Sequence, residues 1–369
     1  MKINSSKENL MEGIQVIQAS VSPRTTLPIL HNFLMEAAES KIKLVRTDLE
    51  LATTHYVNAE VVEPGSITVP AKEFSDILHT LSNDQEITIT TDESNKVHIK
   101  SGKSKFWIMG APKDEYPIIP DMEKENVVAV PAESVQRMIQ KTIFAASAQE
   151  TRYVLNGVQW VCGPKGFELV ATDGRRLAVA SQEAIAGAKD FKIIVPSKIL
   201  NELTRFLNSE KPAEGATIDV GVSTNQIGFR INQTTFISRL IEGNFPNYEQ
   251  VIPAKVDITF EADTKELLAV TRRAALCTSD RGGAVKYQMT AGTLMVSASS
   301  QKMEFNDEIH TEYSGNDFHV AFNPQYVIDV LKNISTDRVS FGLTNAVNPV
   351  LVEPVGEKGC RYVVMPVRS

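Results

Sequence analysis

The chain has few of the residues and motifs on which most catalytic and metal sites depend. Only three of its 369 residues are cysteines, which lie far apart and are odd in number, so they predict neither a metal site nor a disulfide framework. The six histidines show no metal-ligand spacing. The sequence contains no Gly-x-x-x-x-Gly-Lys-[Ser/Thr] phosphate loop and no Gly-x-Ser-x-Gly nucleophile elbow. We therefore expect a protein that is not an enzyme, with no cofactor and no metal.

Long apolar runs and a positive net charge are lacking as well. The first eight residues have no apolar segment of the signal-peptide kind, and no run is long enough to cross a membrane. With so few cysteines, this predicts a reducing, cytoplasmic location and no membrane partner. The formal net charge of −7 argues against a protein that grips DNA through many phosphate contacts.

What the sequence does contain is one pattern, repeated three times. In each copy a β-rich segment runs into a proline followed by an amphipathic helix, at Pro70, Pro196 and Pro324. We expect each proline to occupy the first helical position, where no backbone N–H needs a partner. A hydrophobic segment that ends in a small hydroxyl residue precedes each of these helices at a constant spacing. Those hydroxyl residues are Thr47, Thr172 and Ser297.

The repeat predicts an α+β fold of three tandem domains, each with two helices and about eight strands. In the first copy, residues 29–37 and 51–61 are predicted as strands by their β-branched and alternating character. Proline-rich segments at 111–120 and 244–253 are typical of extended linkers. The predicted domains are therefore residues 1–122, 127–250 and 253–369.

Thr172-Asp173-Gly174-Arg175 could suggest a catalytic aspartate. However, Thr47-Asp48-Leu49-Glu50 holds the same place in the first copy. A repeated structural turn therefore explains Asp173 better.

Several segments together resemble the bacterial DNA polymerase III beta subunits, the sliding clamps, and the resemblance covers the whole chain. They are Thr26-Leu27-Pro28-Ile29-Leu30, Arg152-Tyr153-Val154-Leu155-Asn156-Gly157, Ala171-Thr172-Asp173-Gly174-Arg175-Arg176-Leu177-Ala178, Phe245-Pro246-Asn247-Tyr248 and Tyr362-Val363-Val364-Met365-Pro366-Val367-Arg368. The resemblance implies a head-to-tail homodimer that closes into a ring around duplex DNA, independent of sequence, with helices inside and sheets outside. It implies a processivity factor without a catalytic site.

The resemblance also implies a hydrophobic cleft between the second and third domains. In the family this cleft receives short peptides from the polymerase III alpha subunit, the clamp-loader complex, other DNA polymerases and repair proteins. The matching residues are Arg152, Leu155, Thr172, Gly174, Arg175, Arg176, Leu177, Pro246, Val251, Val363, Val364, Met365, Pro366, Val367 and Arg368. Arginines at the rim would orient the polar groups of a peptide. Gln250 and Ser369 depart from some relatives, so peptide preference is expected to differ while the cleft is kept.

By resemblance, template DNA is contacted by Arg24, Gln149, Arg152 and Tyr153, although Val154 lacks the second aromatic ring of some relatives. The predicted helices also present basic residues, among which Lys72, Arg137, Lys141, Lys198 and Arg205 are further candidates for DNA contact. The others are Lys265, Arg272, Arg273 and Lys332. The dimer interface is expected to join Phe106 and Ile108 to the third domain around Leu276, Cys277, Met303 and Phe305.

Other interpretations stay open on the residues alone. Charge alone favours ordinary solvated helix faces. Periodicity alone favours Leu155, Leu177 and Val363 as core residues. A repeat-built scaffold that binds proteins without encircling DNA would also fit the repeat.

Overall fold

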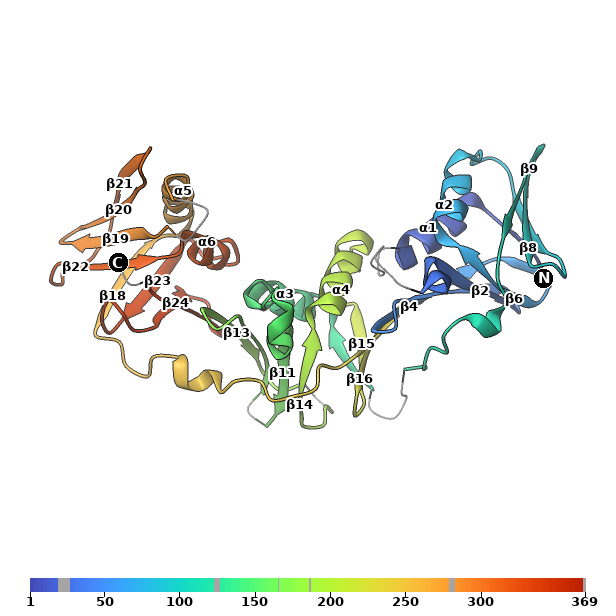
Figure 1. Ribbon diagram of the computed structural model, residues 1–369. Coiled ribbons are helices and arrows are strands. Elements are labelled where there is room, and N and C mark those ends of the chain that lie inside the picture. Colours follow the sequence, from blue (N-terminus) through green and yellow to red (C-terminus); the bar gives the residue numbers. More distant parts are fainter. Residues whose placement is uncertain (19–26, 123–126, 165, 186, 279–282, 368–369) are drawn as a thin grey trace. The chain divides into compact units, whose positions relative to one another are not determined.

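The structure is a computed structural model that describes residues 1–18, 27–122, 127–164, 166–185, 187–278 and 283–367 (Figure 1). The chain forms two compact units, each built from separate stretches of sequence. Unit 1 comprises residues 1–134 and 198–240, and unit 2 comprises residues 135–197 and 241–369. In the described part of the chain, no helix is long and apolar enough to cross a membrane.

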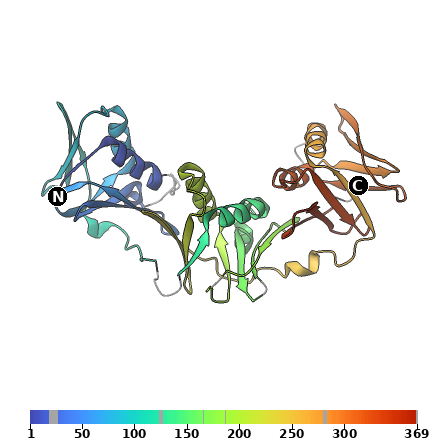
Figure 2. The ribbon, with the colours of Figure 1, turned by 180° about the vertical axis from the view of Figure 1, so that it is seen from behind.

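Unit 1 contains two antiparallel sheets (Figure 2). The five-stranded sheet has the order β5 (Glu60–Glu63), β1 (Lys2–Ser5), β7 (Ile87–Thr91), β8 (Lys96–Ser101), β9 (Ser104–Met109). The eight-stranded sheet has the order β10 (Val127–Pro131), β15 (Thr217–Val222), β16 (Gln226–Ile231), β17 (Thr234–Arg239), β4 (Leu51–Asn58), β3 (Lys41–Thr47), β2 (Asn32–Ala38), β6 (Gly65–Pro70).

Helices α1 (Lys7–Gln18) and α2 (Ala71–Thr80) share one core cluster with strands of both sheets. The predicted apolar stripe of α1 is confirmed, because Leu10, Ile14 and Ile17 are all fully buried in one core cluster. Gly13 lets α1 approach the sheet closely. A Cβ at this position would lie 2.5 Å from Cγ2 of Val57. Unit 1 also contains residues 198–210 of helix α4 (Ser197–Glu210).

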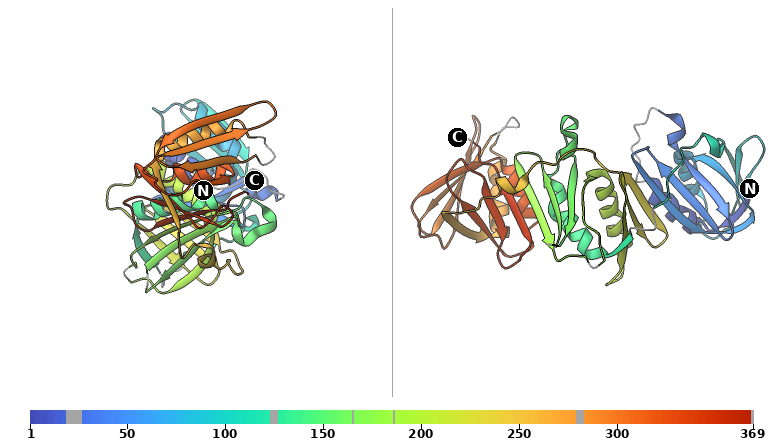
Figure 3. Two further views of the ribbon diagram at one scale, coloured as in Figure 1. Left: turned by 90° about the vertical axis from the view of Figure 1, so that its left-hand side faces the viewer. Right: turned by 90° about the horizontal axis from the view of Figure 1, so that it is seen from below.

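Unit 2 also contains two antiparallel sheets (Figure 3). The eight-stranded sheet has the order β14 (Phe191–Pro196), β11 (Gly157–Gly163), β12 (Gly166–Thr172), β13 (Arg176–Gln182), β25 (Cys360–Val364), β24 (Val350–Pro354), β23 (Arg338–Leu343), β18 (Ile258–Asp263). The four-stranded sheet has the order β21 (Glu304–His310), β20 (Thr293–Ser299), β19 (Val285–Thr290), β22 (Phe318–Phe322). Its helices are α3 (Ala132–Thr142, from Val135 onward), α5 (Thr264–Ala275) and α6 (Pro324–Lys332).

Each eight-stranded sheet joins strands from two neighbouring repeats. In unit 1, β4 of the first repeat pairs antiparallel with β17 of the second, with Ala52 opposite Ile237. In unit 2, β13 of the second repeat pairs with β25 of the third, with Leu177 opposite Val363. Pairing in this way removes two sheet edges that would otherwise be exposed. The predicted α+β repeat is confirmed, with elements α1–α2 and β1–β9, α3–α4 and β10–β17, and α5–α6 and β18–β25.

Some local predictions were wrong. Pro70 and Pro196 end strands β6 and β14, and their helices begin one residue later. Pro70 pairs with Asn32 in the sheet, which holds its ψ at 116° and keeps it out of the helix. Only Pro324 occupies the first helical turn, after the Asn323 cap.

The predicted strands at 29–37 and 51–61 also differ in detail. Residues 28–31 form a 3₁₀ turn, η1, before β2, and residues 51–61 divide into β4 and β5, which belong to different sheets. The first proline-rich segment contains the 3₁₀ turn η2 (Lys113–Glu115). It is held by buried Tyr116, whose hydroxyl donates to the Asn32 carbonyl oxygen at 3.3 Å. Prolines therefore do not make this segment uniformly extended.

Candidate functional site

The turn between β12 and β13 is fixed by its own side chains. Thr172 Oγ1 accepts a hydrogen bond from the Gly174 N–H at 3.0 Å and donates to the Arg176 carbonyl at 2.6 Å. Asp173 Oδ1 accepts from the backbone N–H groups of Arg175 and Arg176 at 2.9 and 3.0 Å. Gly174 has a φ of +83°, a conformation that favours glycine.

The first repeat makes the same bonds. Thr47 Oγ1 accepts from the Leu49 N–H and donates to the Leu51 carbonyl, both at 2.9 Å. Asp48 Oδ1 accepts from the backbone N–H groups of Glu50 and Leu51. The interpretation of Asp173 as a structural turn residue is therefore confirmed.

An apolar pocket of roughly 120 Å³ lies beside the β12–β13 turn, entirely within unit 2. Its lining comprises Leu155, Thr172, Gly174, Arg175, Arg176, Leu177, Pro246, Asn247, Tyr248, Val251, Val363 and Met365. Leu155, Leu177 and Val363 are also buried members of one core cluster with Phe245. The core interpretation and the cleft interpretation of these three residues are therefore compatible, because the core surface forms the floor of the pocket.

Several predicted cleft residues do not line this pocket. Val364 is completely buried and faces Val350 and Arg176 in the sheet. Pro366 and Val367 follow β25, where the Val367 N–H donates to the Ala321 carbonyl at 2.8 Å. Arg368 lies outside the described residues, as does Ser369.

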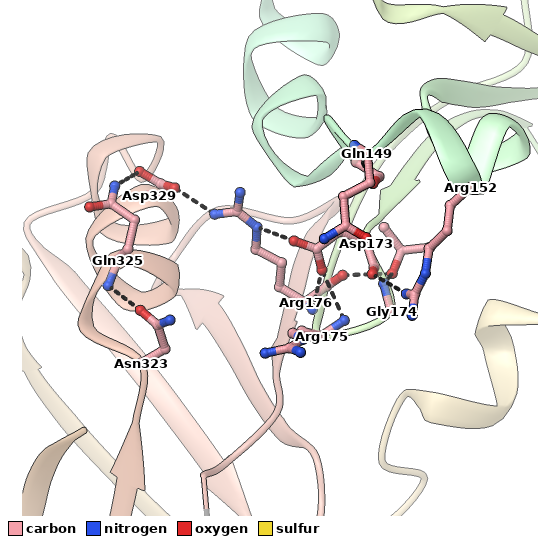
Figure 4. Close-up of polar contacts among 11 residues, drawn as sticks. Gln149, Arg152, Asp173, Gly174, Arg175, Arg176, Asn323, Gln325 and Asp329 are labelled. Atoms are coloured by element: carbon pink, nitrogen blue, oxygen red, sulfur yellow. Dashed lines mark hydrogen bonds and ion pairs between the residues drawn. The ribbon is translucent and has the colours of Figure 1, made fainter. Parts of the chain in front are cut away.

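Arg152 lies at the rim. It belongs to the 3₁₀ segment η4 (Glu150–Leu155), and its Nη1 donates to the Asp173 carbonyl at 3.0 Å (Figure 4). A Cβ on Gly174 would lie 2.9 Å from this Nη1, so glycine leaves room for the guanidinium above the turn. Arg175 is exposed and has no ion pair with any residue that the structure describes. Arg152 and Arg175 therefore provide the positive charge at the mouth of the pocket.

Arg176 has a different role from the rim arginine that was predicted. Its Nε donates to Asp173 Oδ2 at 3.1 Å, and its Nη1 donates to Asp329 Oδ2 of α6 at 2.5 Å. The guanidinium also lies between two rings, with its Cζ 5.6 Å from the Phe144 ring centre and 5.0 Å from that of Tyr326. Because the side chain is only 12% exposed, it joins the turn to α6 rather than presenting its charge to a ligand (Figure 4).

Two lining residues, Asn247 and Tyr248, were missed. Tyr248 belongs to the 3₁₀ turn η5 (Tyr248–Val251), and its hydroxyl donates to Glu168, which also lies 3.7 Å from Arg361. Burial and the Glu168 carboxylate raise the pKa of Tyr248 well above its usual value, so its hydroxyl stays protonated. The Phe-Pro-Asn-Tyr motif could have identified Tyr248 as a lining residue, because it follows the predicted cleft residue Pro246 by only two positions.

The candidate DNA-contacting residues fall into different environments. Lys72, Arg137, Gln149 and Tyr153 are exposed, Tyr153 to 60%. Arg205 is half-exposed and pairs with Glu202 three residues earlier on α4. Arg24 lies outside the described residues.

Two lysines contradict the prediction that the helices expose them. Lys141 is only 7% exposed and forms an ion pair with Glu357 near the end of β24. Lys198 is partly buried and forms an ion pair with Asp48 of the first-repeat turn. Each ion pair joins a helix, α3 or α4, to a residue that follows a strand of the same unit, so both charges stabilise the fold.

Four of the candidate interface residues, Phe106, Ile108, Met303 and Phe305, lie on or beside two edge strands, whereas Leu276 and Cys277 follow α5. Strand β9 is the last strand of its sheet, where Phe106 and Trp107 are 38% and 58% exposed. Strand β21 is the last strand of the four-stranded sheet, with Phe305 on it and Met303 just before it. Leu276 is 74% exposed. Cys277, however, is only 6% exposed and is buried within its own chain. It therefore does not lie on the surface, contrary to the prediction that it belongs to the dimer interface.

Comparison with known proteins gives a consistent result. The profiles of the DNA polymerase III beta subunit match residues 1–120 for the N-terminal domain, 129–247 for the central domain and 249–368 for the C-terminal domain. The chain is 32% identical to the beta sliding clamps of Haemophilus influenzae and Escherichia coli K12, over 100% of this chain and of each relative.

Solved structures agree. The DNA polymerase III subunit beta from Pseudomonas aeruginosa has a TM-score of 0.94 at 31% identity, over 100% of both chains. The sliding clamp from Bacillus subtilis has a TM-score of 0.95 at 27% identity, over 100% of this chain and 99% of that one. The C. crescentus clamp, with polyethylene glycol bound at its proposed beta-motif tethering region, has a TM-score of 0.94 at 29% identity over the same shares. The chain therefore belongs to the DNA polymerase III beta subunit family, the beta sliding clamps.

Proposed function

We propose that two copies of this chain close into a head-to-tail ring around duplex DNA and tether the replicative polymerase and other DNA-processing proteins through the pocket beside Thr172. The pocket carries this proposal, because it gives a chain with a full-length match to sliding clamps a place to hold a partner. The chain would act as a processivity factor rather than an enzyme. Its domains would be residues 1–122, 127–250 and 253–369, and its location the cytoplasm, at the nucleoid during replication.

The pocket suits a short peptide with apolar anchors. Its floor is made of branched aliphatic side chains, Leu155, Leu177 and Val363, and Met365 adds an adaptable wall. Arg152 and Arg175 at the mouth would pair with carbonyl or carboxylate groups of the peptide. Because the pocket and the interdomain contact of Arg176 share one turn, partner binding would depend on the turn's geometry.

Within the chain, the strand pairs β4–β17 and β13–β25 join neighbouring repeats, and we call them the internal joints. They suggest how the ring closes. Ala52, Leu177 and Asn306 hold the same place in the repeat, since each lies opposite the hydroxyl residue of its own hairpin. Ala52 and Leu177 pair with Ile237 and Val363 across their joints. The equivalent of Ile237 and Val363 in the first repeat is Trp107 on β9. The same rule therefore sets Asn306 of one copy opposite Trp107 of the other.

This register makes chemical sense. It sets Phe305 opposite Ile108, both on the core-facing side of their strands, and Glu308 opposite Lys105. Opposite charges that face each other across antiparallel strands stabilise the pair by about 0.2–1 kcal/mol. Leu276 and Met303 would add apolar contact, and pairing would cover the edges of β9 and β21.

Contacts with DNA would be few and weak. Lys72, Arg137 and Arg205 would lie on the helix face toward the duplex, with Gln149, Arg152 and Tyr153 on loops. In an acidic chain, such contacts add little affinity, so retention would depend on the closed ring rather than on phosphate binding.

Retention on circular DNA tests the proposal. The protein is loaded by its clamp loader onto nicked circular plasmid, passed over a sizing column in high salt, and the plasmid is then linearised. We expect the protein to stay on the circle and to leave the linear form, because an electrostatic complex would not distinguish the two. Loss from both, with loading shown independently, would refute encirclement and leave a scaffold that only binds proteins.

A further inference from the structure

The five-stranded sheet of unit 1 has two chemically different faces. Ile3, Ile89, Val97 and Ile99 point to the core formed with α1 and α2. Because successive side chains alternate, their neighbours point away from it. The side chains on this outer face of β1, β7, β8 and β9 are Lys2, Asn4, Thr88, Thr90, Lys96, His98, Lys100, Lys105, Trp107 and Met109.

The part of the outer face formed by β8 and β9 is basic although the chain is acidic. None of those ten residues is a carboxylate, and the segment 96–109 contains four lysines and no Asp or Glu, whereas the whole chain has a net charge of −7. Lys100 and Lys105 are directly opposite in the β8–β9 pair, an arrangement that is destabilising for like charges. Neither makes an ion pair with the residues that the structure describes. Carboxylates border the face elsewhere. Glu60 and Glu63 of β5 lie opposite Asn4 and Lys2, with Nδ2 of Asn4 donating to Oε2 of Glu60 at 2.8 Å, and Asp92 from the β7–β8 turn is 2.9 Å from Nε2 of His98.

Trp107 stands on the edge strand of this face, beside the lysines of β8. It is 58% exposed, and Nζ of Lys96 lies 5.1 Å from its ring centre. The other tryptophan, Trp160, is 1% exposed in unit 2. An exposed tryptophan flanked by lysines combines a surface for stacking a base with partners for phosphates.

We propose that this outer face binds single-stranded DNA, with a base on Trp107 and phosphates beside Lys96 and Lys100. A duplex fits less well, because its bases are stacked on one another and offer no free face to the indole. An acidic peptide would satisfy the lysines but would leave the tryptophan without a matching group. The site goes beyond the encircling of a duplex in the ring's interior and is compatible with ring closure. Lys96 and Lys100 lie on β8, one strand away from the edge that Glu308 would approach.

Tryptophan fluorescence of the full-length dimer tests this, because the chain has only two tryptophans and Trp160 is buried. Titration with a 20-nucleotide oligo-dT should quench Trp107 saturably. Two lysine–phosphate contacts give a salt slope of about −1.4, so raising salt from 50 to 200 mM should weaken binding roughly sevenfold. The same length of duplex should bind with no quenching of Trp107.

Variants locate the contact. With labelled oligo-dT, Trp107→Ala should weaken binding roughly 5- to 150-fold, the range for losing one stacked base. The Lys96→Ala/Lys100→Ala pair should remove most of the salt slope, whereas the matched control Lys255→Ala/Lys358→Ala should keep it. Sedimentation should show that all variants remain dimers.

Two results would overturn the proposal. If oligo-dT binds the Trp107→Ala and double-lysine variants as well as the native protein, the DNA uses another surface. If acrylamide quenches Trp107 poorly in the dimer and well in a dilute monomer, the second copy covers the face and is its true occupant.

Discussion

The ion pair between Arg176 and Asp329 offers the sharpest test of how the pocket is held. The changes are Asp329→Asn, which removes one carboxylate at nearly constant shape, and Arg176→Met, which keeps an unbranched apolar side chain between Phe144 and Tyr326. Together with the double variant they form a thermodynamic cycle. The cycle isolates the interaction between the two side chains from the cost of each change by itself.

The structure sets the size of the effect. The side chains of Arg176 and Asp329 are 12% and 19% exposed, so solvent screens the pair only slightly. A hydrogen bond between charged groups contributes about 1.5–3 kcal/mol. The larger loss of about 3–5 kcal/mol for a stranded buried charge is not expected for Asp329→Asn, because Asp173 still binds the Arg176 guanidinium. We expect a coupling energy of about 2 kcal/mol.

The assay is urea unfolding of the full chain in a Trp107→Phe background. Trp160 is then the only tryptophan, and it lies on β11 in the same sheet as β13, so its fluorescence reports unit 2. A coupling energy below about 0.5 kcal/mol would refute the reasoning, since it would mean that the turn and α6 are held by packing alone.

Three other changes have defined outcomes. Lys105→Glu should raise the dissociation constant of the dimer in sedimentation by about 2- to 30-fold, because it replaces an attraction of about 0.2–1 kcal/mol with a repulsion of similar size. Adding Glu308→Lys should restore the dimer, and a double variant that dimerises no better than Lys105→Glu would refute the proposed register. His55 is buried against Thr234, and burial lowers its pKa to about 4, so the folded chain resists the proton that the unfolded chain takes up below pH 6.5. Its contribution is therefore intact above pH 6.5 and lost as the pH falls toward 4. At pH 4.5 this difference in pKa between the folded and unfolded chain should lower the free energy of unfolding by about 2–3 kcal/mol. His55→Gln should make the urea midpoint less dependent on pH. Leu177→Ala should weaken a clamp-binding peptide by about tenfold in fluorescence anisotropy without changing dimer mass, since it removes part of the pocket floor; unchanged affinity would mean that the peptide binds elsewhere.

Sequence reasoning found the repeat because its signals are local. Amphipathic stripes such as Leu10, Ile14 and Ile17 fix which helix face is buried, and the hydroxyl–aspartate turn recurs at Thr47 and Thr172 with the same hydrogen bonds. Ten of the predicted cleft residues line one pocket.

The failures share a physical cause, which is that they depend on partners distant in sequence. Lys141 looks exposed on a helical wheel, but Glu357 is 216 residues away, and Asp329 is 153 residues from Arg176. A helical pattern also cannot show that Pro70 must complete a strand before α2 begins. Only the sheet pairing with Asn32 sets that boundary.

The hairpin turns that follow Thr47 and Thr172 suggest how the proposed joint between copies would differ from the joints within a chain. At the first internal joint Asp48 of the turn binds Lys198 of the next repeat's helix, and at the second Asp173 reaches Asp329 of the next helix through Arg176. In the third repeat the hairpin extends further beyond Ser297, to the pair of Ser299 with Glu304, and its turn, residues 300–303, contains no carboxylate. Lys72 nevertheless stands where Lys198 does in its own helix.

In the proposed ring, the joint between copies would therefore lack both the covalent linker and the ionic contact of the turn with the neighbouring helix. Strand pairing, apolar contact and exposed charge pairs would hold it. Exposed pairs are worth about 0–1 kcal/mol each and weaken with salt. This joint should open before the internal ones, which is what a ring must do to admit DNA without unfolding. Replacing Gln301, in that turn, with Asp would supply a partner for Lys72 and should slow subunit exchange between labelled dimers. An unchanged exchange rate would mean that the turn and the helix do not meet across the joint.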